Sequence, residues 1–205
     1  DVKYRSLLDP KLTEIFKTTN QPGATSEMWK EAARIGGMMI QSDWIQCTPW
    51  NNPLEKGMGY TWNFGQYVAG EAGIWVNTEG KRFVNENANR KVRADAILVE
   101  QGKGLKAVAV ANKAATASLE GRRPGFMDKA LKDNLIKQYD SLDALAADWK
   151  MPADTLKASI AQLNGYFKDG KDPQFGRIVK DLKPMEEGPW YAMEMSPKVH
   201  HCMGG

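Results

Sequence analysis

The most constraining feature of the sequence is a pair of short extended runs separated by three residues. GIWVN at 73–77 and KRFVN at 81–85 are rich in β-branched and aromatic residues, and Thr78-Glu79-Gly80 joins them. A three-residue connection that ends in glycine is typical of a bulged β-hairpin, because glycine adopts the left-handed conformation without strain. The sequence therefore predicts a β-hairpin over residues 73–85.

The segment before this hairpin predicts one helix followed by extended and irregular chain. Residues 25–37 carry apolar side chains at helical spacing and predict a short helix capped by Thr25. Residues 38–46 have an extended character, and we expect Trp44 to pack against the helix. Two prolines and two glycines then predict irregular structure from residue 49 to about residue 60.

The rest of the chain is predicted to be mainly helical. A helix is expected over 91–101, and a buried strand over 105–111 runs into an alanine-rich segment. Three further helical segments, expected to pack as a cluster, are predicted at 124–139, 141–149 and 152–167. Alternation in PWYAMEMSP then predicts a last strand that leads to a histidine pair. The predicted fold class is α+β, with a small mixed or antiparallel sheet, the hairpin at 73–85 and a helical cluster over 112–168.

Composition excludes several classes of protein. The 205 residues, 42% apolar and 26% charged, suffice for one hydrophobic core with room for a satellite lobe. The longest apolar runs are too short to span a bilayer, and the first residues lack the layout of a signal peptide. The net charge of +3 is dispersed, so nucleic-acid binding is not expected. The two cysteines form no CxxC motif, which excludes a redox dithiol.

The histidine pair near the end of the sequence raises the question of a metal site. His200 and His201 precede Cys202, and Cys47 would have to complete a ligand set. Adjacent residues on a strand point to opposite faces, so at most two of the three could share one ion. We therefore predict no metal site, and expect one buried and one exposed imidazole.

Five segments together resemble a known family. In chain order they are TNQPGAT at 19–25, IQCTP at 45–49, GIWVNTEGKRFVNENANR at 73–90, GKDPQFGR at 170–177 and PKVHHCMGG at 197–205. The chain resembles the fumarate reductase and succinate dehydrogenase flavoprotein family, closest to its soluble, flavocytochrome c type branch, and the resemblance covers almost the whole chain.

The resemblance implies a capping, substrate-binding domain with flanks from an FAD-binding domain. On this basis residues 1–45 are a flank of the FAD-binding domain, 46–197 are the capping domain, and 198–205 begin the return to the FAD-binding domain. The expected cofactor is FAD in the parent protein, since the family's dinucleotide fingerprint is absent from this sequence. The fragment alone is not expected to be a competent enzyme. Thr25 and His200 match positions near the flavin.

The resemblance also implies a reaction and an acid. Family members reduce an activated carbon-carbon double bond with hydride from the flavin, while an arginine protonates the neighbouring carbon. Arg90 matches this arginine. An arginine in water has a pKa above about 12, so it needs a partner that reloads its proton. The family's glutamate and arginine relay is replaced here by Gln66 and Ala69. The expected partners are a small unsaturated substrate, the FAD-binding domain of the same parent chain and an electron donor such as a haem, quinol or flavin module.

Several substitutions indicate that the substrate is not fumarate itself. Thr48 replaces a family histidine that binds a carboxylate, and Asn63 and Gly65 replace a methionine and a threonine of the substrate site. His201 retains its family identity as a substrate ligand. Removing a partner from a buried carboxylate typically costs a few kcal/mol.

Aromatic residues between 44 and 75 suggest which side chains line the substrate site in place of the family's carboxylate ligands. Trp50, Trp62 and Phe64 lie on a segment rich in proline and glycine, where we expect them to be hard to bury. The hypothesis is a pocket for a flatter, less charged and aromatic or bulky unsaturated compound, with Tyr67 or Tyr60 helping the proton path. Core packing is the alternative for each aromatic residue.

Two classes of function remain open at this point. The first is a flavin-dependent reductase of activated double bonds, or the reverse dehydrogenase, of which this chain is the substrate cap. The second is a non-catalytic module that kept the fold and binds a small ligand or a partner. Arg90 and His201 favour the enzyme, whereas Thr48, Gln66 and Ala69 favour the binding module or a changed substrate.

Overall fold

A small antiparallel sheet organises the computed structural model, which describes residues 8–10, 12–13 and 16–202. The strand order is β1-β5-β3-β2, and β4 also pairs with β5; every pairing is antiparallel. The strands are β1 (Ile45–Asn51), β2 (Ile74–Asn77), β3 (Ala107–Asn112), β4 (Lys137–Tyr139) and β5 (Trp190–Cys202). The predicted α+β class is confirmed, and the sheet is antiparallel throughout.

Helices surround this sheet and fill most of the remaining chain. They are α2 (Glu27–Arg34), α3 (Trp62–Gly70), α4 (Arg90–Gly102), α5 (Lys113–Arg122), α6 (Phe126–Lys132), α7 (Leu142–Asp148) and α8 (Ala153–Asp169). Asparagine and serine side chains cap α4, α5 and α7, each accepting a hydrogen bond from a backbone N–H of the first turn. All residues of β2 and β3 are buried.

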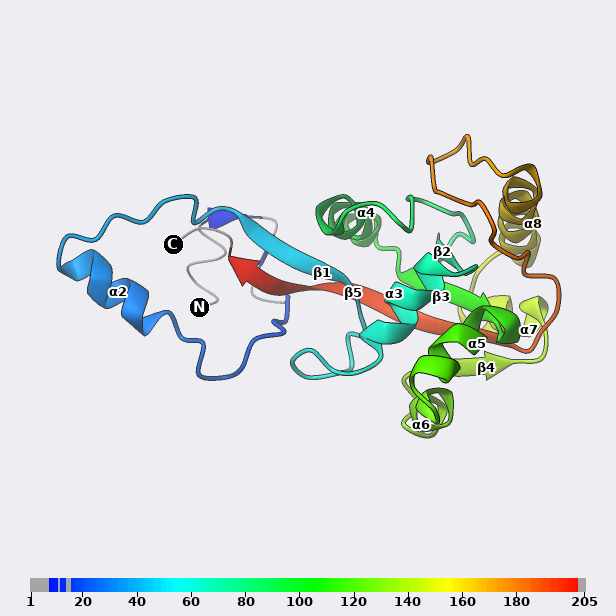
Figure 1. Ribbon diagram of the computed structural model, residues 1–205, viewed down its shortest axis with the longest axis horizontal. Helices are drawn as coiled ribbons and strands as arrows, with labels where there is room; N and C mark the ends of the chain where they lie inside the picture. Colours follow the sequence, from blue (N-terminus) through cyan, green and yellow to red (C-terminus); the bar gives the residue numbers. More distant parts are fainter. Residues whose placement is uncertain (1–7, 11, 14–15, 203–205) are drawn as a thin grey trace.

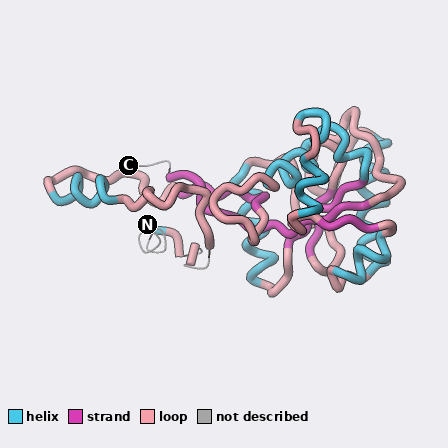
Figure 2. Tube along the Cα trace, turned by 90° about the horizontal axis from the view of Figure 1, so that it is seen from below, coloured by secondary structure: helices cyan, strands magenta, loops and turns pink. Residues whose placement is uncertain are grey.

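β5 joins the two parts of the molecule visible in Figure 1. The first half of this 13-residue strand pairs with β3 and β4 inside the globular part, and its second half pairs with β1. The β1–β5 pair projects from the globular part toward a segment that we call the arm, residues 19–44. Figure 2, turned by 90°, shows the same projection.

The arm differs from expectation in its contacts. Helix α2 spans Glu27–Arg34, has no buried residue, and begins after Ser26 rather than at a Thr25 cap. Trp44 is 56% exposed, so the prediction that it packs against this helix is wrong. Apolar side chains elsewhere on the arm are exposed as well, Met38 at 84%. The arm makes too few contacts of its own to bury them.

The predicted hairpin is present as a turn that follows one short strand, β2. Gly80 takes the left-handed conformation, with φ of 76°, and its N–H donates to Asn77 O at 2.9 Å. The second predicted strand, residues 81–85, is reduced to a single bridge between Val76 and Arg82. Strand β2 instead pairs with β3 over four residue pairs, while Arg82 enters a buried ion cluster.

Two further expectations are corrected by the sheet. Pro49 lies inside β1, in a segment predicted to be irregular; β1 is an edge strand, where a missing N–H is tolerated. The helix predicted over 124–139 ends at Lys132, because Asn134 has a positive φ of 53° and residues 137–139 form β4. Pairing with β5 satisfies backbone groups in place of the helix. By contrast, α4 and β3 confirm the helix and strand predicted at 91–101 and 105–111.

No helix within the described residues is long and apolar enough to cross a membrane.

A buried cluster of four charges ties the chain after β2 to the chain after α8. Arg82 donates to both carboxylate oxygens of Glu86, at 2.8 and 2.6 Å, and to Asp172 at 2.8 Å. Arg177 lies 3.3 Å from the same Glu86 carboxylate and donates to Gly73 O at 2.7 Å. The four side chains are at most 2% exposed. Such a cluster stabilises the fold only while each charge keeps its partners.

Replacing Glu86 by glutamine should therefore strongly destabilise the chain. The substitution leaves two buried arginines with one carboxylate, a loss of about 3–5 kcal/mol in the free energy of unfolding. Glu79→Gln is the matched control, since Glu79 pairs with Lys81 on the surface and such pairs contribute about 0–1 kcal/mol. Urea denaturation of both variants measures the difference, and equal stability of the two would refute a structural role for the cluster.

Candidate active site

Arg90 stands at the first position of α4, directed toward β1. The Asn89 side chain caps the helix by accepting from Val92 N at 3.0 Å, which fixes where α4 starts. Arg90 Nη1 donates to Gln46 Oε1 at 2.9 Å. The guanidinium carbon lies 5.5 Å from the centre of the Trp50 ring. Two residues of β1 therefore hold the predicted catalytic arginine in place.

The histidine pair lies beside Arg90 because of a bulge in β5. Gln46 pairs with His201 and Cys47 with Val199, so His200 is an extra residue between them. The two imidazole rings consequently lie in contact, with centres 3.7 Å apart and planes tilted by 49°, and the expectation that they point to opposite faces is wrong. Through Gln46, the predicted substrate ligand His201 is thus connected to Arg90.

His200 has the more protected environment of the two imidazoles. Its Nδ1 hydrogen-bonds Thr19 Oγ1 at 2.6 Å, whereas His201 is exposed. Partial burial, together with the nearby charges of His201 and Arg90, lowers the pKa of His200. The lowered pKa favours the neutral form of the His200 ring, and Arg90 carries the positive charge beside the histidine pair.

The Trp50 ring packs against Arg90, and Gly65 leaves space for Trp50. A Cβ atom at position 65 would lie 2.6 Å from Trp50 Cβ, so only glycine fits at this point of α3. Trp50 and Phe64 are 2% and 0% exposed and belong to the main core, so the expectation that they are hard to bury is wrong. Sequence reasoning recognised Gly65 only as a substitution and missed its contact with Trp50.

Arg93, which sequence reasoning did not single out, shares the same indole. Its guanidinium carbon lies 4.4 Å from the Trp50 ring centre and 5.7 Å from that of Trp75. Three residues along a helix place Arg93 on the same face as Arg90. Trp50 thus carries two arginines. We use the term "arginine cluster" for Arg90, Arg93, Trp50 and Gln46.

Three other predicted residues direct their groups elsewhere. Thr48 is fully buried and its hydroxyl donates to Asn51 Oδ1. Tyr67, two residues after Gly65 and thus on the other side of α3, lies under Arg122 of α5 at 4.5 Å. The Tyr60 hydroxyl donates to Asp133 at 2.6 Å, beyond the end of α6. These contacts do not connect either phenol to Arg90.

Asn63 and Gln66 lie on α3 beside Gly65. Asn63 Nδ2 donates to Tyr60 O at 2.6 Å, while its buried Oδ1 has no partner within the described part of the chain. Gln66 is half-buried. An unpaired buried acceptor is uncommon and marks a place where a ligand donor or water could bind.

The loop between β1 and α3 is fixed by two buried charged residues that sequence reasoning missed. Lys198 Nζ donates to Glu55 O at 2.8 Å and Gly57 O at 3.0 Å. The Glu55 carboxylate accepts Tyr60 N at 2.7 Å and lies where a side chain at Gly59 would collide with it. Burial lowers the pKa of Lys198 to about 8. No sequence motif predicts these contacts of Lys198 and Glu55, although Gly57 and Gly59 take part in them.

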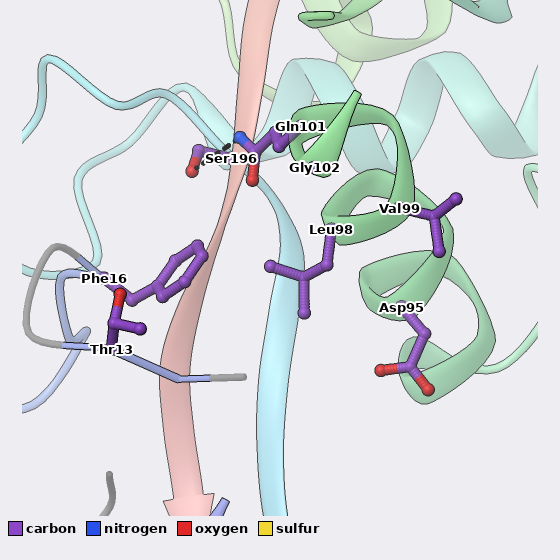
Figure 3. Close-up of a pocket in the computed structure, with 8 residues that line it drawn as sticks. All are labelled: Thr13, Phe16, Asp95, Leu98, Val99, Gln101, Gly102 and Ser196. Atoms are coloured by element: carbon purple, nitrogen blue, oxygen red, sulfur yellow. Dashed lines mark hydrogen bonds between the residues drawn. The ribbon is translucent and has the colours of Figure 1, made fainter. Parts of the chain in front are cut away.

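A separate apolar hollow of about 600 Å³ lies toward the C-terminal end of α4. Figure 3 shows Phe16 facing Leu98 across it, with Gln101 Nε2 bonded to Ser196 Oγ at 3.2 Å on its rim. Its lining includes neither Arg90 nor Arg93. The hollow is therefore not part of the arginine cluster.

The histidine and cysteine residues form no metal centre among the residues described. No group of three or more His, Cys, Asp or Glu side chains is placed to hold an ion in this part of the chain, and Cys47 and Cys202 form no disulfide with each other. The closing Met203-Gly204-Gly205 of the family-like ending lies outside the described residues.

Comparison with known proteins identifies the family. The family model described as an FAD binding domain matches residues 7–205. The acrylate reductase flavoprotein subunit of Shewanella woodyi is 36% identical over all of this chain and 40% of its own length. The NADH:acrylate oxidoreductase of Vibrio harveyi is 31% identical over 95% of this chain and 19% of its own length.

The fold has a solved counterpart. A flavocytochrome c3 fumarate reductase in its open conformation matches with a TM-score of 0.77 and 25% identity, over 99% of this chain and 34% of that chain. The chain therefore belongs to the FAD-binding domain family of flavoproteins, whose cofactor is FAD, and the resemblance to the fumarate reductase flavoproteins is confirmed. It spans 40% or less of the length of each of these proteins.

Gly65→Ala should destabilise the chain although alanine is the better helix former. The new Cβ would collide with Trp50 Cβ and with Trp50 O, at 2.6 and 3.1 Å, and overpacking of this kind costs about 1–3 kcal/mol. Gly165→Ala in α8 is the matched control, because nothing lies within 4 Å of its Cβ and it should gain up to about 1 kcal/mol. Thermal unfolding compares the two, and a Gly65→Ala variant as stable as the control would contradict the close contact.

Stability should rise with pH because of Lys198. The lysine has a pKa of about 8 in the folded chain and 10.5 ordinarily, so between these values the unfolded chain binds more protons. The free energy of unfolding should therefore increase by roughly 1–3 kcal/mol from pH 8 to 10.5 through this group. Urea denaturation at pH 7.5 and 10 should show this rise in the free energy of unfolding for the unsubstituted chain and for Lys171→Met, a control at an exposed lysine. A rise of the same size in Lys198→Met would rule this cause out.

Proposed function

We propose that this chain is the substrate-capping part of an FAD-dependent reductase that acts on an activated carbon-carbon double bond. The observation that carries the proposal is the placement of Arg90, held by Gln46 and Trp50 beside the adjacent histidines of β5. A cation on a rigid helix end, next to polar groups from two strands, is suited to hold an anionic substrate and give it a proton.

The proposed division of the chain is 1–45 as a flank of the FAD-binding domain, 46–197 as the cap and 198–205 as the return. The exposed apolar side chains of the arm support it. Met28, Ile35 and Met38 are each more than three-quarters exposed, and large exposed apolar areas are typical of surfaces that other protein covers. We infer that another part of the FAD-binding domain covers the arm.

The residues of the arm fit a flavin that is held mainly by another part of the protein. Thr25 is exposed, and the neutral His200 ring lies between the arm and the arginine cluster, so both could contact the isoalloxazine ring. Glu27 in the first turn of α2 makes that helix end unsuited to a pyrophosphate. When bound, FAD supplies the hydride that adds to one carbon of the double bond.

Arg90 supplies the proton in this proposal. The carbon next to the one that receives hydride takes a proton from the guanidinium, and one C=C bond becomes a C–C bond with two new C–H bonds. The neutral Arg90 then regains a proton from solvent. Gln46 accepts from Nη1, which leaves the remaining N–H groups of Arg90 for the substrate.

The substrate of the proposed enzyme is a small unsaturated compound with less charge than a dicarboxylate. Thr48 uses its hydroxyl within β1 and offers no second carboxylate anchor. The burial of Trp50 and Phe64 in the core leaves them little surface for stacking a large aromatic substrate. The acrylate reductases among the relatives agree with a small substrate.

Arg90→Gln in the full-length parent protein tests the function. With a reduced viologen dye as electron donor and a panel of unsaturated acids and amides, kcat should fall about 10²- to 10⁴-fold, the usual contribution of a general acid. Flavin absorbance should be unchanged. Arg123→Gln, an exposed arginine after α5, serves as the control and should retain full activity.

Two outcomes would contradict the proposal. Turnover that does not depend on Arg90 would mean that another group donates the proton. Bound flavin with no turnover on any compound would instead favour the non-catalytic module that binds a ligand or a partner.

A further inference from the structure

Arg93 is a partly buried cation that forms no ion pair with a carboxylate of the described residues. Its Nη1 donates to the backbone oxygen of Glu86 at 2.8 Å, and its buried Nε has no partner in this part of the chain. Trp50 and Trp75 cover the guanidinium. Burial, and then the charge of Arg90, lower the pKa of Arg93 to about 10. The side chain is still protonated at pH 7, so its positive charge persists.

The start of α4 is an unfavourable place for two such cations. Arg90, Lys91 and Arg93 occupy the first turn, which holds no acidic residue. The N-terminal end of a helix favours anions, and like charges three residues apart repel. Lys91 is neutralised on the surface by Asp95 at 2.6 Å.

The carboxylate of Glu86 forms no ion pair with Arg90 or Arg93. Glu86 is fully buried and already engaged by Arg82 and Arg177. Its backbone oxygen accepts a hydrogen bond from Arg93, and its carboxylate charge only partly offsets the lowering of the pKa of Arg93. The described chain therefore presents two guanidinium groups on one indole, with donors left over, at a helix end that itself attracts negative charge.

We propose that Arg93 is a specificity-determining residue that, with Arg90, binds the single carboxylate of a small unsaturated monocarboxylic acid. This inference rests on the proposed function and names its substrate class. Arg93 holds the carboxylate through the planar, forked geometry that guanidinium groups offer to carboxylates, while Arg90 also gives the proton. The Trp50 indole lies against both guanidinium groups and excludes water on that side, which strengthens the charge interaction.

The test compares an acid with its neutral amide on the full-length holoenzyme. In Arg93→Gln, KM for acrylate should rise roughly 10- to 100-fold, the usual effect of losing a hydrogen bond to a charged group. KM for acrylamide should change less than about 3-fold, because the amide carries no charge. Arg93→Lys should recover part of the loss, since lysine keeps the charge without the fork.

Lys91→Gln is the matched control, as it removes one positive charge from the same helical turn at the surface. It should leave the acid-to-amide ratio of KM unchanged. Equal changes for acid and amide in Arg93→Gln would overturn the inference and assign Arg93 to packing alone. An effect of Lys91→Gln as large as that of Arg93→Gln would overturn it as well, because general electrostatics would then suffice.

A binding measurement separates this inference from the proposed function. Isothermal titration calorimetry of the flavin-loaded protein with propionate and propionamide needs no turnover. Propionate should bind more tightly than propionamide, and Arg93→Gln should weaken propionate by the same roughly 10- to 100-fold. If no compound is reduced but this difference is present, the reductase proposal fails and the carboxylate site stands. If propionate and propionamide bind equally, the site itself is refuted.

Discussion

The pairing of β5 is the interaction on which the rest of the structure depends. One strand joins β3 and β4 in the globular part and then β1 at the base of the arm. Because β1 carries Gln46 and Trp50 and β5 carries the histidines, their register sets which side chains meet Arg90. The bulge at His200 is part of that register and turns both imidazoles to one side.

Charge placement separates the stabilising part of the molecule from the proposed site. Arg82 and Arg177 are buried with two carboxylates and form a closed set of ion pairs. Arg90 and Arg93 lie close by but have aromatic and neutral polar contacts in place of carboxylates. Buried or half-buried cations without counter-charge are costly to a fold, and such groups concentrate at functional sites.

The sequence was sufficient where local pattern decides the structure. The helix over 91–101, the buried strand at 105–111 and the turn at Gly80 follow from periodicity and glycine chemistry. Pro49 in β1 could not be predicted, because its tolerance depends on β1 being an edge strand. In the same way, the loss of helix after Lys132 depends on the distant partner that β5 offers to β4.

The candidate site was predictable only in part. Arg90 and the histidine pair came from a resemblance to a family. Arg93 escaped notice because an arginine on a helix is ordinary by sequence, and only the shared contact with Trp50 distinguishes it. Lys198 and Glu55 were missed for the same reason, since their roles arise from burial and from backbone oxygens that no local pattern marks.

Glu86 links the core to the proposed site through two of its groups, the side-chain carboxylate and the backbone oxygen. Its carboxylate holds Arg82 and Arg177, while its backbone oxygen holds Arg93. A small shift of this residue would therefore be transmitted to the guanidinium over Trp50 without any change in the residues that touch a ligand. If the proposed site binds a carboxylate, substitutions among the buried ion pairs would thus reach it although none of them touches the ligand.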